Sequence, residues 1–382
     1  MQKAFKGLEK AISEIKGEEM KLSDVCKLIV DCPHSTAKDE GTGYPLIRTP
    51  NIGRGRLKLD GVHRVSENVY LDRNQRATPQ TNDLILAREA PVGNVAVIKD
   101  EKVCLGQRTV LIRPDEKKVD ADFLVYYLLA PKQQHLLLSA SNGATVSHLN
   151  MSAIRNLEID LPEMDKQKRM GCILSKLDDL IVENERINKN LLEQAQAIYT
   201  KRFITDADSL WPEGKLSDLI EVCYGKDHKK LHDGDIPVYG SGGIMRHVDR
   251  ALYEQESVLV PRKGTLNNVM YVNEPFWSVD TMFFTKMKRQ NVAKFVFHFL
   301  KGKDLAAMNA GSAVPSMTTK ILNAIPLQIP DDQTLSTFEA QVSPFYQAAS
   351  YNNKESENLA AIRDSLLPKL MSGEIDVSDI DL

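Results

Sequence analysis

The residues best suited to contact a charged ligand lie between Tyr44 and Arg76. This segment holds seven arginine or lysine residues against three acidic ones, which leaves a local excess of four positive charges. Within it, the run Asn51–Arg56 places Arg54 and Arg56 in a glycine-rich turn, where the backbone can approach a ligand closely. Arginine donors in such a turn suit phosphate oxygens and base edges. The alternative, a solvated loop with ordinary surface arginines, stays open.

A looser polar set occurs in the second half of the chain, from Lys226 to Asn268. Each of its members is by itself more typical of a plain surface than of a binding site. His228 and His232 stand four residues apart, but no third ligand follows at a useful spacing. The pair therefore indicates a polar loop, and we expect no metal.

The sequence offers no recognisable site for catalysis. It lacks a G-x-x-x-x-G-K-[ST] loop, which argues against a motor ATPase. The string Asn273–Trp277 (NEPFW) is the nearest match to the N/D-P-P-Y/F loop of adenine-N6 methyltransferases, but it lacks the first proline. No glycine-rich motif for a methyl donor accompanies it. We therefore expect no catalytic residue and no cofactor.

The composition is that of a soluble globular protein, with 42% hydrophobic and 26% charged residues. No apolar stretch approaches 18 residues, and the first 20 residues lack a secretory core, so we expect no membrane and a cytoplasmic location. Five scattered cysteines without a C-x-x-C pair favour reduced thiols. Because the net charge is −3, any electrostatic attraction to phosphates must come from a basic face of the chain or from partner subunits.

The elements that would position these side chains occur twice. The tetrapeptide KLSD at Lys21–Asp24 recurs at Lys215–Asp218. Further on, Ser141–Pro162 aligns without gaps to Asn309–Pro330 at an offset of 168 residues, and the apolar positions of the two segments coincide. Each segment ends in alternating apolar residues that a proline stops, which is typical of a half-buried strand. Each half therefore predicts a mixed α/β globule.

A long helical pattern follows each proline. In the first copy the apolar residues keep a heptad spacing, and Asn184 falls at a position equivalent to Asn352 in the second copy. An asparagine in a coiled-coil seam fixes the register of the helices. The predicted seam consists of Ile173, Leu177, Leu180, Asn184, Ile187, Leu191 and Ile198, with Phe345, Asn352, Leu359, Ile362 and Leu366. Two such helices would pack antiparallel, with the globules at opposite ends; two unrelated amphipathic helices are the alternative.

These repeated elements together resemble the specificity (S) subunits of Type I restriction–modification systems. The resemblance covers the chain from Lys21 to about Met371, in both copies. The matching elements are the KLSD segments, the GATVSHL-like turns Gly143–Leu149 and Gly311–Met317, the strands Leu157–Pro162 and Leu327–Pro330, and the helix starts at Gln167 and Gln333. A strand, arginine and turn element at Leu84–Ile98 is echoed at Ser257–Val272, where Arg88 and Arg262 match. The sequence departs from the family at the helix entries, which read PEMDKQ and PDDQ.

The resemblance implies a DNA-reading subunit without chemistry of its own. In the family, each globule is a target recognition domain for one half of a split site on double-stranded DNA. The two helices act as a spacer, and two methyltransferase (modification) subunits dock on them. Whether restriction or translocase subunits join stays open. Two alternatives also stay open, a self-contained adenine-N6 DNA methyltransferase and a coiled-coil scaffold protein.

The implied fold class is α/β (α+β), with two repeated target recognition domains separated by two long antiparallel coiled-coil helices in a pseudo-twofold arrangement. The predicted boundaries are an N-terminal helix over 1–20, domain 1 over 21–162, spacer helix 1 over 163–204, domain 2 over 215–330, spacer helix 2 over 331–372 and a tail over 373–382. We hypothesise that the N-terminal helix packs near the ends of the spacer helices. A frayed tail is the alternative.

DNA contacts are predicted from both globules. In the first, the candidates are Arg48, Asn51, Arg54, Arg56, Arg64 and Arg88. In the second, they are Lys229, Lys230, Ser241, Arg246, Arg262, Lys263 and Asn268. The sequence gives neither the bases recognised nor the spacing between half-sites.

Overall fold

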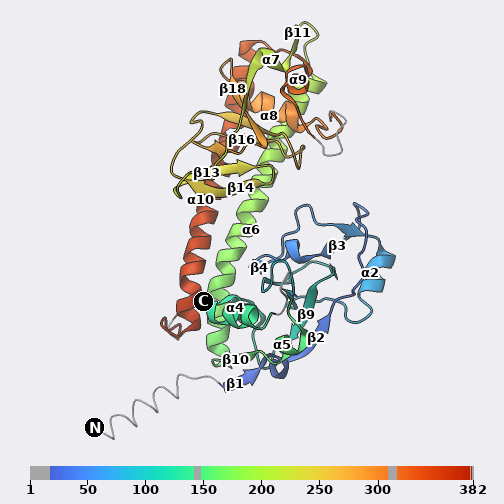
Figure 1. The fold of residues 1–382 in the computed structure, drawn as a ribbon, viewed down its shortest axis with the longest axis vertical. Coiled ribbons are helices and arrows are strands. Elements are labelled where there is room, and N and C mark those ends of the chain that lie inside the picture. The colour runs from blue at the N-terminus through green and yellow to red at the C-terminus, as the bar shows by residue number, and fades with distance from the viewer. Residues whose placement is uncertain (1–17, 142–147, 309–315, 379, 381–382) are drawn as a thin grey trace, which may run out of the picture. The chain divides into compact units, whose positions relative to one another are not determined.

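The computed structural model describes residues 18–141, 148–308, 316–378 and 380 (Figure 1). Most of the predicted N-terminal helix and most of both GATVSHL-like turns lie outside these ranges. The last three residues predicted for that helix, 18–20, instead belong to strand β1 (Glu18–Lys21). They are extended because β1 pairs antiparallel with β10 (Glu158–Leu161), a partner that the local sequence does not reveal.

The chain forms two compact units. Unit 1 comprises Met1–Glu185 and Asn353–Leu382, and unit 2 comprises Arg186–Asn352. Each unit holds one mixed α/β globule together with part of α6 (Met164–Thr200) and part of α10 (Asp332–Met371). The repeated α/β class that the sequence predicted is therefore confirmed. None of the helices in the described ranges combines the length and apolarity that a bilayer span requires.

The globule of unit 1 is built on a five-stranded sheet with the order β2-β9-β6-β7-β4. Its strands are β2 (Cys26–Asp31), β9 (Thr109–Pro114), β6 (Leu84–Ala87), β7 (Val95–Val97) and β4 (Gly55–Arg56). A three-stranded sheet with the order β5-β3-β8 adjoins it, formed by β5 (Arg64–Val65), β3 (Tyr44–Ile47) and β8 (Cys104–Leu105). Every residue of β6 is buried, because Leu84 and Leu86 pack into one apolar cluster while Ile85 and Ala87, on the other face, pack into another.

Short helices complete this globule. They are the 3-10 turns Leu22–Val25 and Thr49–Asn51, α2 (Glu67–Arg73), α3 (Ala121–Leu129), α4 (Pro131–Ser139) and α5 (Met151–Arg155). Asp120 caps α3 by accepting a hydrogen bond from the Phe123 amide. The helix is then buried from Phe123 to Leu129, because the sheet covers one side of it and the core around α6 covers the other.

The globule of unit 2 repeats this plan. Its four-stranded sheet has the order β12-β18-β15-β16 and its three-stranded sheet the order β14-β13-β17. The strands are β12 (Ile220–Tyr224), β18 (Met282–Met287), β15 (Ser257–Pro261), β16 (Met270–Val272), β14 (Gly243–Val248), β13 (Ile236–Gly240) and β17 (Trp277–Ser278), and a further pair joins β11 (Glu213–Lys215) to β19 (Pro326–Gln328). The helices are α7 (Leu216–Leu219), α8 (Ala293–Lys301) and α9 (Thr319–Asn323), and a π-turn over Lys201–Thr205 follows α6.

The KLSD segments show why the repeat extends to atomic detail. In each copy the carboxylate of the aspartate accepts a hydrogen bond from the lysine amide three residues earlier, at 3.1 Å for Asp24 and 2.8 Å for Asp218. The leucine between them, Leu22 or Leu216, is fully buried. The aspartate therefore closes a single turn that delivers an apolar side chain to the core.

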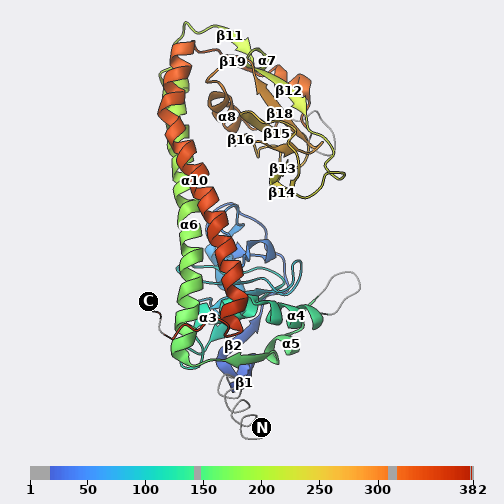
Figure 2. The same cartoon turned by 90° about the vertical axis from the view of Figure 1, so that its left-hand side faces the viewer.

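In both units a segment of α6 runs antiparallel to a segment of α10 (Figure 2). In unit 1, the Arg363 guanidinium donates to Asp178, and the Asn184 amide donates to the Glu355 carboxylate at 2.8 Å. In unit 2, the Asn352 amide donates to the Asn188 side-chain oxygen at 2.8 Å. Partly buried side-chain hydrogen bonds, in addition to apolar residues, thus hold the helices together.

The predicted seam differs from these contacts by one residue at several positions. Ile362 is 48% exposed, whereas its neighbour Arg363 pairs with Asp178, the residue after the predicted Leu177. Leu180 is also 53% exposed. Ile187 is likewise 38% exposed, beside the inward-facing Asn188. A heptad assignment prefers leucine and isoleucine to charged residues, so it cannot place a seam that buries a paired carboxylate.

Each unit also joins its globule to the long helices through one buried polar cluster. In unit 1, Asp178 of α6 accepts a 2.6 Å hydrogen bond from the Tyr126 hydroxyl of α3. Burial and the Asp178 charge raise the pKa of Tyr126 above its usual range, so the hydroxyl stays protonated and donates. In unit 2, His298 of α8 lies between Gln196 and Tyr346, 2.8 Å from each.

We expect removal of the Asp178 carboxylate to weaken unit 1 strongly. An Asp178→Ala variant should lose on the order of 3–5 kcal/mol of unfolding free energy, because it leaves the Arg363 charge and the Tyr126 hydroxyl without their buried acceptor. Urea unfolding followed by far-UV circular dichroism measures the loss. Asp364→Ala is the matched control, since Asp364 also pairs with Arg363 but its side chain is 58% exposed. That control should lose less than about 1 kcal/mol, and equal losses would contradict the assignment.

Unit 2 should lose stability in mild acid because of His298. Burial lowers the pKa of this imidazole to about 4. An unfolded histidine titrates near 6.5, so below that pH the unfolded state binds a proton that the folded state does not bind. The cost should grow to about 3 kcal/mol as the pH falls from about 6.5 to about 4. Tryptophan fluorescence during urea unfolding reports on this unit alone, since Trp211 and Trp277 are the two tryptophans of the chain.

A His298→Gln variant is the control for this pH dependence. Glutamine does not titrate, so the difference in stability between the variant and the wild type should change with pH over this window. A constant difference would show that His298 does not titrate as its burial requires.

Candidate nucleic-acid interface

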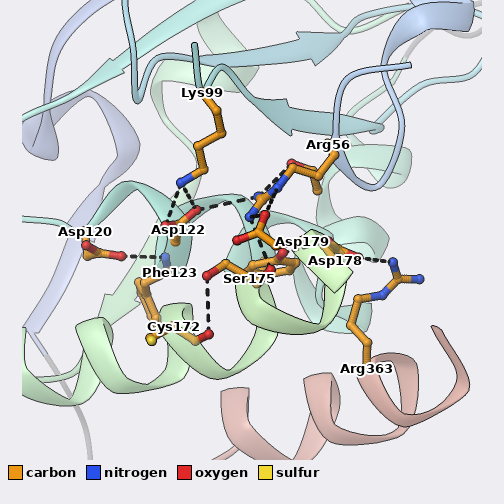
Figure 3. Close-up of polar contacts among 12 residues, drawn as sticks. Arg56, Lys99, Asp120, Asp122, Phe123, Cys172, Ser175, Asp178, Asp179 and Arg363 are labelled. Carbon is orange, nitrogen blue, oxygen red and sulfur yellow. Dashed lines mark hydrogen bonds and ion pairs between the residues drawn. The ribbon is translucent and has the colours of Figure 1, made fainter. Parts of the chain in front are cut away.

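The glycine-rich turn Asn51–Arg56 lies against the helix α6 of its own unit (Figure 3). Gly55 has a φ of +106°, and a Cβ atom there would stand 2.3 Å from the Asp178 carboxylate. Arg56 donates from Nη2 to the Asp179 carboxylate at 2.8 Å, and its side chain is only 12% exposed. The glycines do permit a close backbone approach, as the sequence suggested, but the surface approached is a protein helix.

An alternating row of charges continues this contact. The Arg56 guanidinium lies 3.6 Å from Asp122, the second residue of α3, and the Lys99 ammonium donates to the same carboxylate at 2.8 Å (Figure 3). In unit 2 the second residue of α8 is Lys294, which pairs with Glu256 and Glu339. The same helix position is therefore negative in one unit and positive in the other.

Three further predicted residues of unit 1 also have protein partners. Asn51 is buried, and its side chain accepts from the Arg48 amide and donates to the Lys58 carbonyl, which shapes the turn after β3. The guanidinium of Arg54 donates to the Leu129 carbonyl at 3.3 Å, and that of Arg64 donates to the Gly43 carbonyl at 2.7 Å. These hydrogen bonds leave part of each arginine exposed, and DNA contact by them stays a prediction.

Arg88 lies at the end of β6 and is the centre of a buried network. Its Nε donates to the Leu149 carbonyl at 2.7 Å, its Nη1 donates to Asp31, and its Nη2 lies 2.7 Å from His148 Nε2. Because a guanidinium only donates, His148 Nε2 accepts and the imidazole proton sits on Nδ1, 2.6 Å from Glu89. The other oxygen of Glu89 pairs with Arg108 at 2.9 Å.

Arg262 occupies the same place in unit 2, at the end of β15. Its Nη1 donates to the Asp280 carbonyl at 2.9 Å, and its guanidinium carbon lies 5.1 Å from the ring centre of Tyr224. Beside it, Lys263 is exposed, and the Asn268 amide donates to the Ser241 carbonyl at 2.9 Å. Four of the predicted residues of unit 2 therefore gather at one edge of the globule.

The remaining predicted residues of unit 2 lie elsewhere. Lys229 and Lys230 are exposed in the loop after β12, and Arg246 of β14 pairs with Asp233 at 2.8 Å. Within the described ranges, no group of histidine, cysteine and carboxylate side chains is placed to hold a metal ion.

Sequence reasoning missed the partners that fix the two arginines, namely Asp31, His148 and Arg108 in unit 1 and Tyr224 in unit 2. These residues come from segments far apart in the chain, so no local spacing brings them together. A comparison of the two copies around Arg88 and Arg262 would have pointed to the right strands, but not to the side chains beside them.

Comparisons with known proteins agree with the repeated architecture. The family of Type I restriction modification DNA specificity domains matches residues 14–194 and again residues 208–355. The Type I restriction enzyme MjaIX specificity subunit of Methanocaldococcus jannaschii is 22% identical over 365 residues, which cover 84% of this chain and 83% of that protein. The HindI specificity subunit of Haemophilus influenzae is 20% identical, with coverages of 70% and 80%.

A solved structure shares the fold. The crystal structure of a Type-I restriction-modification system S subunit from M. genitalium superposes with a TM-score of 0.56 at 17% sequence identity, over 92% of this chain and 95% of that one. The two folds therefore correspond over nearly their full lengths.

We expect Arg56 to act in folding. Arg56→Ala should cost on the order of 1–3 kcal/mol of stability, because it removes charge-assisted bonds to Asp179 and leaves Asp122 with one cation fewer. Hydrogen exchange of residues 164–185 measures the loosening of α6. Arg64→Ala is the control, since Arg64 donates to a single carbonyl of its own globule and should leave α6 protected. Unchanged protection in Arg56→Ala, with altered DNA sequence preference, would instead make Arg56 a base reader.

Proposed function

This chain belongs to the family of Type I restriction modification DNA specificity domains, and on that premise we propose that it reads a two-part DNA sequence for a methyltransferase. The observation that carries the proposal is the internal repeat. Two globules with matching backbone frames each pack on their own segment of the long helices. Two similar readers in one chain suit a target with two similar halves.

Each globule would read one half-site. Phosphate contacts position a protein on the duplex, and hydrogen bonds to base edges in the major groove specify the sequence. Mixed α/β globules with polar loops at one sheet edge can present such donors and acceptors. The predicted DNA contacts remain candidates, most directly the exposed Lys263 in unit 2.

The long helices would set the distance between half-sites. α6 has 37 residues and α10 has 40, so each is about 55–60 Å long at 1.5 Å per residue. A stiff pair of helices lets the two globules engage only half-sites at a matching separation, just as dimer geometry sets half-site spacing in other DNA-binding proteins.

The chemistry would reside in partner subunits. Both curated relatives are named as specificity subunits of restriction enzymes, and this chain acts with other subunits of such a system and with DNA. We propose further that two methyltransferase subunits bind, one to each copy of the repeat, on the outer helix faces. They would also add positive charge, which a chain of net charge −3 needs for tight DNA binding.

The direct test is methylation by the reconstituted complex. The chain purified with the methyltransferase subunit of its own host should methylate adenines in a split motif of fixed spacing, read by methylation-sensitive sequencing. DNA binding by the complex should weaken steeply with salt, because phosphate contacts release counterions. Methyl transfer by the chain alone would make it a methyltransferase. Absence of DNA binding by the complex at every salt concentration would make it a scaffold.

Lengthening both helices should change the spacing that the complex recognises. Four residues inserted in α6 between Leu180 and Leu191, with four in the facing part of α10 between Asn352 and Ser356, add about 6 Å to the pair. The spacing should grow by about two base pairs, at 3.4 Å each, while the bases of each half-site stay the same. Sequencing of the methylated motif measures both.

The control carries the same four-residue insertion in the exposed segment between Asp206 and Leu210, outside the helices. It should keep the wild-type spacing. An unchanged spacing in the helix variant would contradict the ruler proposal without affecting the assignment of DNA recognition.

A further inference from the structure

The two units share a backbone frame at one edge of the globule. The Arg88 amide donates to the Arg108 carbonyl at 2.8 Å, and the Arg262 amide donates to the Thr281 carbonyl at 2.8 Å. The carbonyl of the same arginine accepts from Leu149 in unit 1, at 3.1 Å, and from Met317 in unit 2, at 2.9 Å. Three segments therefore meet in the same way in both copies.

Two further hydrogen bonds extend the match. Two residues before Arg108, the Gly106 amide donates to the Ile47 carbonyl at 2.7 Å. Two residues before Thr281, the Val279 amide donates to the Tyr239 carbonyl at 3.0 Å. Directly after β2, the Cys32 amide donates to the Thr109 carbonyl. Directly after β12, the Gly225 amide donates in the same manner to the Met282 carbonyl. These hydrogen bonds therefore identify which residue of unit 1 corresponds to which residue of unit 2, without any sequence alignment.

The side chains on this shared frame are almost all different. The central arginine is common to both units, but the residues around it differ in charge and in hydrogen-bonding character. The pairs are Asp31 and Tyr224, Glu89 and Lys263, Gln107 and Asp280, Arg108 and Thr281, and His148 and Ser316. We call these ten residues the frame edge.

The need to hold the central arginine in place does not explain why the side chains around it differ between the two units. The arginines keep their place by different means, Arg88 through an ion pair with Asp31 and Arg262 by stacking on Tyr224. Arg88 is buried and uses its donors on protein acceptors, so its role is to position the turn next to it. In that turn Gln107 is half-buried and its side-chain amide donates to the His34 carbonyl at 2.8 Å, whereas the Arg108 side chain is 56% exposed.

In unit 1 the backbone at this edge is strained. Four non-glycine residues of the described ranges have a positive φ, and the two that are not asparagine are Ala90 and Arg108. A left-handed conformation costs such residues about 1 kcal/mol or more and is typical of positions that contact a ligand. Arg108, at a φ of +66°, is held by the Arg88 amide and by the Glu89 carboxylate in this conformation.

We propose that the frame edge reads the DNA bases in each unit, with Gln107 and Arg108 determining the first half-site and Asp280 and Thr281 the second. This inference rests on the proposed DNA-reading function. The same main-chain hydrogen bonds carry different side chains in the two units, and Arg108 is left-handed whereas Thr281 is not, so each unit would have its own base preference. Arginine and glutamine donate to guanine and adenine edges in the major groove, whereas aspartate accepts from the cytosine amino group and threonine contacts several bases.

Reciprocal exchange between the copies tests the assignment. The complete complex is made with the double variant Gln107→Asp with Arg108→Thr, and separately with Asp280→Gln with Thr281→Arg. Each complex selects sequences from two DNA libraries, one randomised in each half-site. The first variant should change the bases selected in the first half-site only, and the second variant those in the second only.

Lys117→Thr is the matched control for the loss of a cation. Lys117 is exposed and follows Pro114, the last residue of β9. The frame edge lies at the other end of that strand, beside Thr109. This control should leave both half-sites unchanged. Selection of wild-type bases by both double variants would overturn the inference, and so would equal changes in the control.

A conservative variant keeps the proposal testable if the double substitution disturbs folding. Arg108→Lys retains the charge but loses the two-pronged donor, so preference at one base pair of the first half-site should fall by about 5- to 150-fold. Binding to unrelated DNA should hardly change. If wild-type complex selects no sequence from either library, the DNA-reading function itself fails. If the wild type selects and Arg108→Lys keeps full preference, only the frame edge assignment fails.

Discussion

The structure depends on satisfying a carboxylate that is buried where three elements meet. Asp178 of α6 is 3% exposed and accepts hydrogen bonds from Tyr126 of the globule and from Arg363 of α10. A buried charge is tolerated only when its partners are in place. The globule, the first helix and the second helix of unit 1 must therefore assemble together. Unit 2 meets the same requirement with a neutral cluster around His298.

This constraint separates the parts that hold the fold from the parts free to vary. Arg56 of the glycine-rich turn, which looks well suited to DNA, is drawn into the junction because α6 presents Asp179 and α3 presents Asp122. The edge around Arg88 and Arg262 carries no such junction. Its backbone is held by main-chain hydrogen bonds in both units, so the exposed side chains around the central arginine can change without loss of the scaffold. Recognition can then diverge between the copies while the architecture stays the same.

Much of the architecture could be predicted because repetition is visible in the sequence. KLSD returns at Lys215, and the alignment of Ser141–Pro162 with Asn309–Pro330 reveals two globules and two helices. The helix register could not be predicted, because the burial of Asp178 depends on Tyr126, 52 residues away. The turn at Gly55 signalled a close approach correctly, yet a glycine says nothing about what is approached. Charge and glycine content identify binding loops only when no internal partner competes for them.

The opposite charges at the start of α3 and α8 have a consequence for building chimaeras. Asp122 is matched to Arg56 and Lys99, whereas Lys294 is matched to Glu339 on α10. A globule transplanted alone onto the other helix would bring Asp122 to the site of Glu339 and place two like charges in contact. Crossovers between relatives should therefore fall within the long helices, beyond Asp179 or Tyr346, so that every reader travels with the stretch of helix that its charges fit. In gene shuffling, natural or designed, the exchangeable cassette is therefore a globule together with the segments of both long helices that pack on it.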